Sequence, residues 1–180
     1  SAALRVGTAN GGYDLQKADR SPVLRLEDLR RSFGEGERAI HVLRGASTML
    51  FPGEVTALVG PSGAGKSTLL HIAGLLEQPT SGRIVLDGRD CATLAEAERT
   101  RMRRTTIGFI YQFHQLLPEF SAIENVIMPQ MILGKTRSQA KARSRELLTM
   151  LGLENRMGHR PAELSGGEQQ RTAIARGLAN

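Results

Sequence analysis

The stretch GPSGAGKST, residues 60–68, decides the fold. It fits the pattern G-x-x-x-x-G-K-[ST], with Gly60, Gly65, Lys66 and Ser67 at the fixed positions. Glycines let backbone amides approach a polyphosphate, the lysine can reach its outer phosphates, and the hydroxyl can bind Mg²⁺. EVTALVG (54–60) predicts a buried strand before it, and LLHIAGLL (69–76) predicts a helix after it. Strand, loop and helix is the context of a phosphate loop, so the sequence predicts a nucleotide-binding α/β core.

Charge and composition bound the partners. The net charge is +6, which favours anionic partners such as nucleotides or acidic lipid, and an aromatic content of 4% argues against nucleic-acid platforms built on base stacking. A single cysteine suits a reducing cytosol. The basic run at residues 99–104 predicts a solvated helix face.

Strand and helix patterns divide the chain. Further strands are expected at 23–29, 47–51, 81–88 and 107–112, and a charged helix at 93–104. Ser121 and Glu124 form a capping-box pattern that predicts a helix start, and an amphipathic helix is expected at 138–152. We therefore expect a flexible tail at 1–22, a nucleotide-binding core at 23–112, a helical subdomain at 113–164, and a final loop and helix at 165–180.

A second glycine loop lies in ELSGGEQQRTAIARGLAN, residues 163–180. Ser165 and Glu168 have capping-box spacing, and taken alone this pattern fits a capped helix without a ligand. The order of phosphate loop, Gln112, helical insertion and LSGGE, however, resembles the ATP-binding cassette (ABC) ATPases. The resemblance implies a P-loop NTPase fold with an N-terminal antiparallel β region and an α-helical insertion, incomplete at the C-terminus. It also implies ATP and Mg²⁺ as ligands.

The resemblance also assigns roles to residues. Gln112 matches the glutamine that contacts Mg²⁺ and the attacking water, Lys66 matches the catalytic lysine, Ser67 matches a Mg²⁺ ligand, and Phe33 matches the aromatic that stacks on adenine. An apolar loop anchor is the alternative for Phe33. The nucleotide-binding residues so implied are Gly60, Pro61, Ser62, Gly63, Ala64, Gly65, Lys66, Ser67 and Thr68, with Ser165, Gly166, Gly167 and Glu168 acting in trans from a second subunit.

GFIYQFHQLLPEFSAIENVIMP (108–129) and HRPAELSGGE (159–168) are similar to the ATP-binding subunits of bacterial lipoprotein-releasing transporters. This likeness implies an ATPase that acts as a homodimer with membrane permease subunits, on the cytoplasmic face of the inner membrane, without nucleic acid. PTSGRIVLDG (79–88) is shared with macrolide exporters and the cell-division ABC protein, which stay as alternatives. A soluble ABC protein of DNA repair or translation would need a larger insertion.

The family pattern continues beyond a signature helix to an Asp-Glu pair and a switch histidine. This chain ends at Asn180, before those positions, so we expect a truncated sequence or a fragment that is inactive by itself. His71, His114 and His159 have no common metal-site spacing and are expected to be structural or partner-facing.

Overall fold

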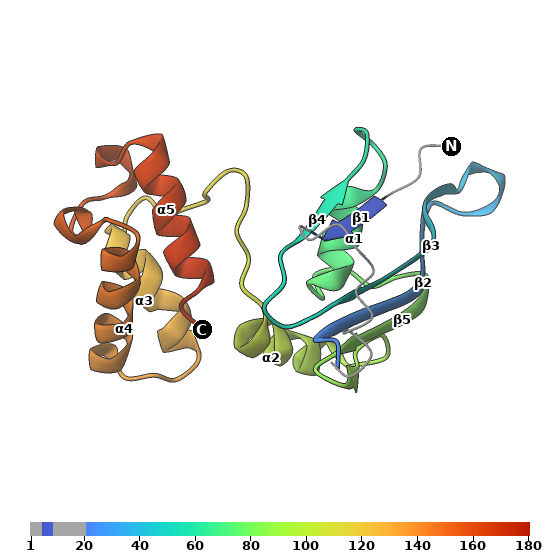
Figure 1. Ribbon diagram of the computed structural model, residues 1–180, viewed down its shortest axis with the longest axis horizontal. Coiled ribbons are helices and arrows are strands. Elements are labelled where there is room, and N and C mark those ends of the chain that lie inside the picture. The colour runs from blue at the N-terminus through green and yellow to red at the C-terminus, as the bar shows by residue number, and fades with distance from the viewer. Residues whose placement is uncertain (1–4, 9–20) are drawn as a thin grey trace. The chain divides into compact units, whose positions relative to one another are not determined.

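The computed structural model describes residues 5–8 and 21–180. The chain forms two compact units, one up to Arg99 and one from Thr100 onward, and α2 continues from the first into the second. Its elements, labelled in Figure 1, are β1 (Arg5–Thr8), β2 (Leu24–Phe33), η2 (Gly36–Arg38), β3 (Ile40–Leu50), β4 (Thr56–Val59), α1 (Lys66–Ala73), β5 (Ser81–Leu86), β6 (Arg89–Asp90), α2 (Glu96–Thr106), α3 (Ala122–Ile132), α4 (Arg137–Met150), η3 (Glu154–Arg156), η4 (Pro161–Glu163) and α5 (Gly166–Gly177).

The first unit is built on an antiparallel sheet in the order β3-β2-β5-β6, which confirms the expected antiparallel β region. Leu24 and Leu26 alternate inward along β2, as strand periodicity requires. A register shift then intervenes, with Asp28 at φ 44°, and Leu29 is buried out of phase with them. The bulge therefore keeps three leucines of one strand on the core side.

The structure differs from the sequence expectation near the N-terminus. Residues 5–8 fall in the segment predicted as a flexible tail, but they form β1, which pairs antiparallel with β4 from Arg5 opposite Val59 to Thr8 opposite Thr56. A strand edge offers unpaired N–H and C=O groups, and a short segment can satisfy them without a strong strand pattern of its own. The rest of the expected tail, residues 1–4 and 9–20, lies outside the described residues.

The end of α1 corrects the prediction for the basic run. Leu75 follows the helix at φ 59°, and it is completely buried. Arg99 is only 4% exposed, and its Nη2 donates to the Leu75 carbonyl at 2.8 Å. Arg99 is therefore not part of a solvated face, since its guanidinium satisfies a buried carbonyl; Arg101 and Arg104 are exposed as expected.

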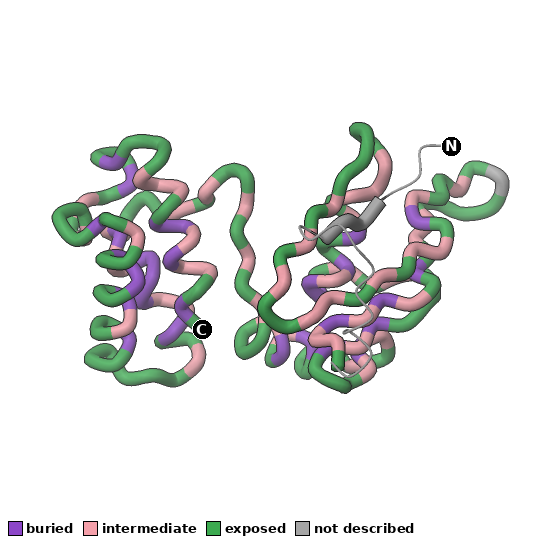
Figure 2. Tube along the Cα trace, in the orientation of Figure 1, coloured by how far each residue is buried: buried purple, intermediate pink, exposed green. Residues whose placement is uncertain are grey.

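The second unit packs α3, α4 and α5 around one apolar cluster. Figure 2 shows buried residues on each of these helices, and the cluster consists of Val126, Leu147, Leu148, Leu153, Ala175 and Ala179. The start of α3 is capped as the sequence predicts, because the Glu124 carboxylate accepts from the Ser121 N–H at 2.9 Å. No helix in the described part of the chain combines the length and apolarity needed to cross a bilayer.

Candidate functional site

The phosphate loop joins β4 to α1 and has the backbone shape that its glycines permit. Gly63 and Gly65 have φ of 77° and 86°, in the left-handed region, and Gly65 is the N-cap of α1. Lys66 begins the helix, and its Nζ donates to the carbonyl oxygens of Gly60 and Pro61 at 2.8 and 2.7 Å. The ammonium thus lies against the loop backbone, and the exposed Ser67 follows it in the first turn of α1.

Strand β3 packs against the phosphate loop at Gly65. A Cβ at Gly65 would lie 3.0 Å from Val42 Cγ1 and 3.2 Å from the Val42 oxygen, so the loop passes close to this strand. The predicted adenine-stacking residue, Phe33, ends β2 and pairs with Ile40 at the start of β3. The register therefore places Phe33 on the strand pair that supports the phosphate loop.

Phe33 is 42% exposed, so part of its side chain faces solvent. The Arg31 guanidinium carbon lies 4.5 Å from the ring centroid, and Arg31 Nε also contacts Glu77 Oε1 at 2.6 Å. One face of the ring is thus covered by a cation, at a distance typical of a cation–π contact. Sequence reasoning missed Arg31, because its partner Glu77 lies 46 positions further along the chain.

Gln112 lies in the second unit, and its surroundings correct one sequence prediction. Residues 107–112 have the apolar pattern of a buried strand, yet they form neither strand nor helix, and no described strand pairs with them. Their backbone passes instead against the end of α5, where a Cβ on Gly108 would overlap the Gly177 oxygen. An apolar extended run becomes a strand only when a neighbouring strand supplies hydrogen bonds, and here a helix end lies beside it.

Two side chains hold the segment that follows Gln112. Arg176 of α5 donates to the carbonyl oxygens of His114 and Gln115 at 2.9 and 2.8 Å. Asn125, nearly fully buried in α3, accepts from the Leu117 N–H at 2.8 Å and donates to the Leu117 oxygen at 3.1 Å. Sequence reasoning missed both residues. For Asn125 a signal was available, because it is a polar residue on the buried face of an otherwise apolar helix.

The second glycine loop forms the start of α5. We call residues 164–168 the signature loop. The Ser165 Oγ accepts from the Glu168 N–H at 3.3 Å, and Glu168 Oε2 accepts from the Ser165 N–H at 2.8 Å, so the capping box is real. Gln169 braces the loop by donating to the carbonyl oxygens of Pro161 and Leu164 at 2.9 and 3.0 Å. Gly166 and Gly167 are exposed at the first helical positions, where N–H groups have no partner in the helix.

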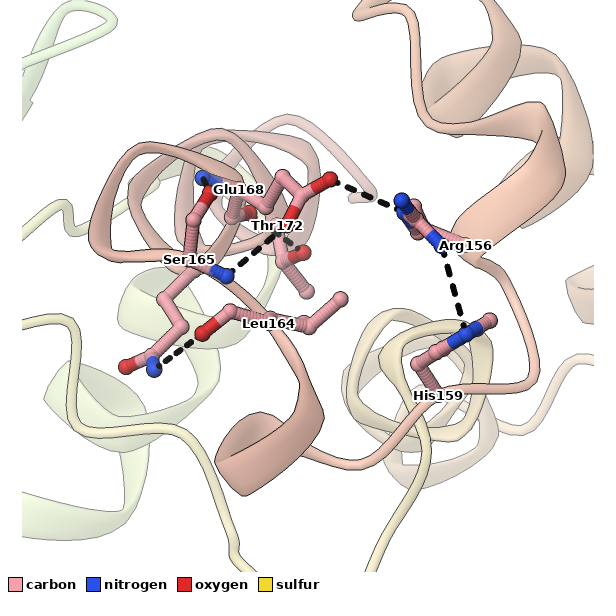
Figure 3. A network of polar contacts seen from close by, with 7 residues as sticks. Arg156, His159, Leu164, Ser165, Glu168 and Thr172 are labelled. Carbon is pink, nitrogen blue, oxygen red and sulfur yellow. Dashed lines mark hydrogen bonds and ion pairs between the residues drawn. The ribbon is translucent and has the colours of Figure 1, made fainter.

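Glu168 is also paired with a residue outside the loop. Arg156 Nε donates to Glu168 Oε1 at 3.0 Å, and Figure 3 shows the two side chains meeting beside Ser165. The pKa of Glu168 is lowered to about 2 by its hydrogen bonds. The largest effect comes from the Ser165 backbone N–H, followed by the Ser165 hydroxyl and then Arg156. The carboxylate is therefore ionised at neutral pH, at the positive end of the helix dipole.

The predicted site residues are thus divided between the units. The phosphate loop and Phe33 belong to the first unit, and Gln112 and the signature loop belong to the second. Within the second unit, α5 has 12 residues, which makes it about 18 Å long. Its C-terminal end holds the Gln112 segment and its N-terminal end carries the signature loop, so these two parts of the site are well separated.

A phosphate loop between strand and helix, with an LSGG loop at the start of a separate helix, defines a nucleotide-binding ATPase domain. The family model described as ABC transporter matches residues 43–180. The chain belongs to the ABC transporter family, whose ATPase domains bind ATP, usually with Mg²⁺, and hydrolyse it.

Curated relatives and solved structures agree with this assignment. Lipoprotein-releasing system ATP-binding protein LolD 2 of Caulobacter vibrioides is 59% identical over 159 residues, which cover 88% of this chain and 70% of the relative. LolD of Nitrobacter hamburgensis is 57% identical, covering 92% and 71%. A dimeric ATP-binding cassette solved in a post-hydrolysis state with ADP and Pi superposes with a TM-score of 0.73 at 34% identity, covering 87% of this chain and 69% of that one. These structures confirm the expected ABC ATPase fold.

Proposed function

We propose that this chain is the ATP-binding subunit of a transporter that uses ATP binding and hydrolysis to release lipoproteins from the bacterial inner membrane. The observation that carries the proposal is the likeness to seven relatives, 55–59% identical, that are all named lipoprotein-releasing system ATP-binding proteins. In this function, residues 23–112 would form the nucleotide-binding core, residues 113–164 the helical subdomain and residues 165–180 the signature segment.

The phosphate loop fits a nucleoside triphosphate. Gly63 has open space where a Cβ would stand, so its backbone can approach a phosphate without obstruction. The Lys66 ammonium can exchange its two carbonyl partners for phosphate oxygens with a small movement of its flexible stem. Ser67 would hold Mg²⁺ through its hydroxyl, with Gln112 as a further ligand, and the metal ion when bound neutralises phosphate charge. Residues 60–68 would therefore bind and orient the nucleotide, with Phe33 against the base.

The signature loop would act on the nucleotide of a second subunit. Ser165 and the N–H groups of Gly166 and Gly167 form a cluster of donors at a helix N-terminus, which suits a terminal phosphate. The dimeric cassettes that superpose on this chain support a paired arrangement. A site completed by both subunits closes when ATP is bound between them, and hydrolysis allows it to reopen.

Residues beside Gln112 would contact the permease at the cytoplasmic face of the inner membrane. Phe113 is 75% exposed, and Ile110 and Leu117 are also exposed large apolar side chains. Large apolar groups gathered on one exposed segment are typical of protein contact surfaces. Arg176 and Asn125 hold the backbone of this segment. A movement of the permease at this surface would therefore be transmitted along the backbone to Gln112.

To test this function, the complete gene product is reconstituted with the permease encoded by a neighbouring gene, in liposomes that carry a lipid-modified protein. ATP should release the lipoprotein, and Lys66→Ala should lower hydrolysis and release by at least about tenfold, because the phosphates lose a charged hydrogen-bond donor. Lys141→Ala, on an exposed position of α4, is the matched control and should retain both activities. Export of a macrolide, or capture of regulators of peptidoglycan hydrolases without lipoprotein release, would instead support the exporter or the cell-division alternative.

A further inference from the structure

Arg156 reaches the signature loop from the segment that follows α4. It ends the three-residue turn η3, and its Nε donates to Glu168 Oε1 at 3.0 Å. Through Nη1 the same guanidinium donates to His159 Nε2 at 3.4 Å, as Figure 3 shows. The Glu168 side chain is 18% exposed and that of Arg156 is 48% exposed, so the pair lies at the edge of the loop rather than in open solvent.

The backbone that carries Arg156 is firmly positioned. At the end of α4, Gly152 N–H bonds to the Thr149 oxygen at 2.9 Å and Leu153 N–H bonds to the Leu148 oxygen at 2.8 Å, which together form a Schellman motif. Leu153 is completely buried in the apolar cluster of this unit. Three residues later the Arg156 carbonyl accepts from the His159 N–H at 3.0 Å. The guanidinium is thus delivered to Glu168 by an anchored turn.

Glu168 creates an electrostatic conflict at this site. Its ionised carboxylate stabilises the helix, because a negative charge in the first turn interacts favourably with the helix dipole. The same charge repels a polyphosphate that approaches the same helix end. Ser165 contributes only uncharged donors, and no other ion pair of Glu168 is found in the described residues. Arg156 is the cation that pairs with this carboxylate in the described residues.

We propose that Arg156 is a positioning residue for ATP-dependent closure of the dimer. Arg156 acts through Glu168. It holds the Glu168 carboxylate in its hydrogen bond with the Ser165 N–H, and it offsets the negative charge of that carboxylate. The signature loop can then accept the terminal phosphate of ATP held by the partner subunit. The inference rests on the proposed function, and it deepens it by adding a residue from outside the loop.

The test is a double-mutant cycle on the complete gene product in its transporter. Glu168→Gln keeps an acceptor for the Ser165 N–H but removes the charge. Arg156→Gln should therefore raise the KM for ATP about fivefold in the wild-type background and less than about twofold in the Glu168→Gln background, with little change in kcat. The rise should diminish with added salt, because screening weakens the repulsion. Arg143→Gln, which breaks the Arg143–Glu146 pair on α4, is the matched control and should leave the KM unchanged.

A role limited to folding predicts a different result. Arg156→Gln would then impair activity equally in both backgrounds and independently of salt, and that outcome, or an unchanged KM in an active enzyme, overturns the positioning role alone. Where Arg156→Gln folds poorly, Arg156→Lys replaces it: it keeps the charge but not the planar donor, and an intermediate KM is expected. If the wild-type transporter does not hydrolyse ATP, or Ser165→Ala changes nothing, the proposed function fails and this inference with it.

Discussion

Replacing Gly65 by alanine should destabilise the protein through two separable effects. The residue has a φ of 86°, and a side chain in the left-handed region costs about 1–2 kcal/mol. Its added Cβ would also lie 3.0 Å from Val42 Cγ1 and 3.1 Å from Leu43 Cδ2, and such overpacking typically costs about 1–3 kcal/mol. Alanine recovers about 0.4–1 kcal/mol by restricting the unfolded chain. The expected loss is about 2–4 kcal/mol.

Gly63 in the same loop provides the matched control. Its φ of 77° is nearly the same, but nothing lies within 4 Å of a Cβ built there. Gly63→Ala should therefore lower the free energy of unfolding only through backbone strain, by about 1 kcal/mol. The difference between the two variants isolates the contact of the phosphate loop with β3.

Urea denaturation of the nucleotide-free protein, with equal m-values, measures this difference without a contribution from ligand binding. A Gly65→Ala loss about 2 kcal/mol larger than that of Gly63→Ala is the expected outcome. Equal losses would refute the inference that β3 supports the loop at Val42.

Three further predictions concern polar groups. The pKa of Glu168 is about 2, below its unfolded value of about 4.3, so its contribution to stability is complete above about pH 4.3 and is lost as the pH falls toward 2. The urea midpoint of the wild-type protein should therefore fall more across that pH window than the midpoint of Glu168→Gln. Parallel curves of midpoint against pH would contradict this prediction. Arg99→Met should cost about 2–3 kcal/mol because it removes the buried charged hydrogen bond to the Leu75 carbonyl, whereas Arg104→Met should stay within about 0.5 kcal/mol. Asn125→Ala should cost about 2–4 kcal/mol and accelerate hydrogen exchange at the N–H of residue 117; an unchanged exchange rate there would be inconsistent with the bond to Asn125.

The parts of the site that sequence predicts are those set by local interactions. The phosphate loop depends on residues within a few positions of one another, and Gly63 and Gly65 do adopt the left-handed backbone conformation that their type permits. The capping boxes at Ser121 and Ser165 each join residues three positions apart. A pattern that contains both partners of an interaction can be interpreted without knowledge of the fold.

The predictions that failed depended on a neighbour distant in sequence. Residues 107–112 have strand composition, but their neighbour in space is the end of α5, so they have no ladder. Arg99 looks like one more basic residue on a polar helix, and only the buried carbonyl of Leu75, 24 positions earlier, changes its role. Hydrophobic period and charge pattern describe what one segment prefers, and they contain no information about which partner it meets.

Arg156 and Arg176 connect the two ends of α5 to segments that lie elsewhere in the sequence. Arg156 pairs with Glu168 at one end of α5, 12 positions away, and Arg176 at the other end binds the His114 carbonyl, 62 positions away. The helix between them is held by Ala173 and Ala175, which are completely buried. A packed helix of this length cannot compress to absorb movement at one end. We therefore predict that a displacement of the Gln112 segment is transmitted to the signature loop unless the Arg176 hydrogen bonds break, and breaking them is costly because their donor is charged.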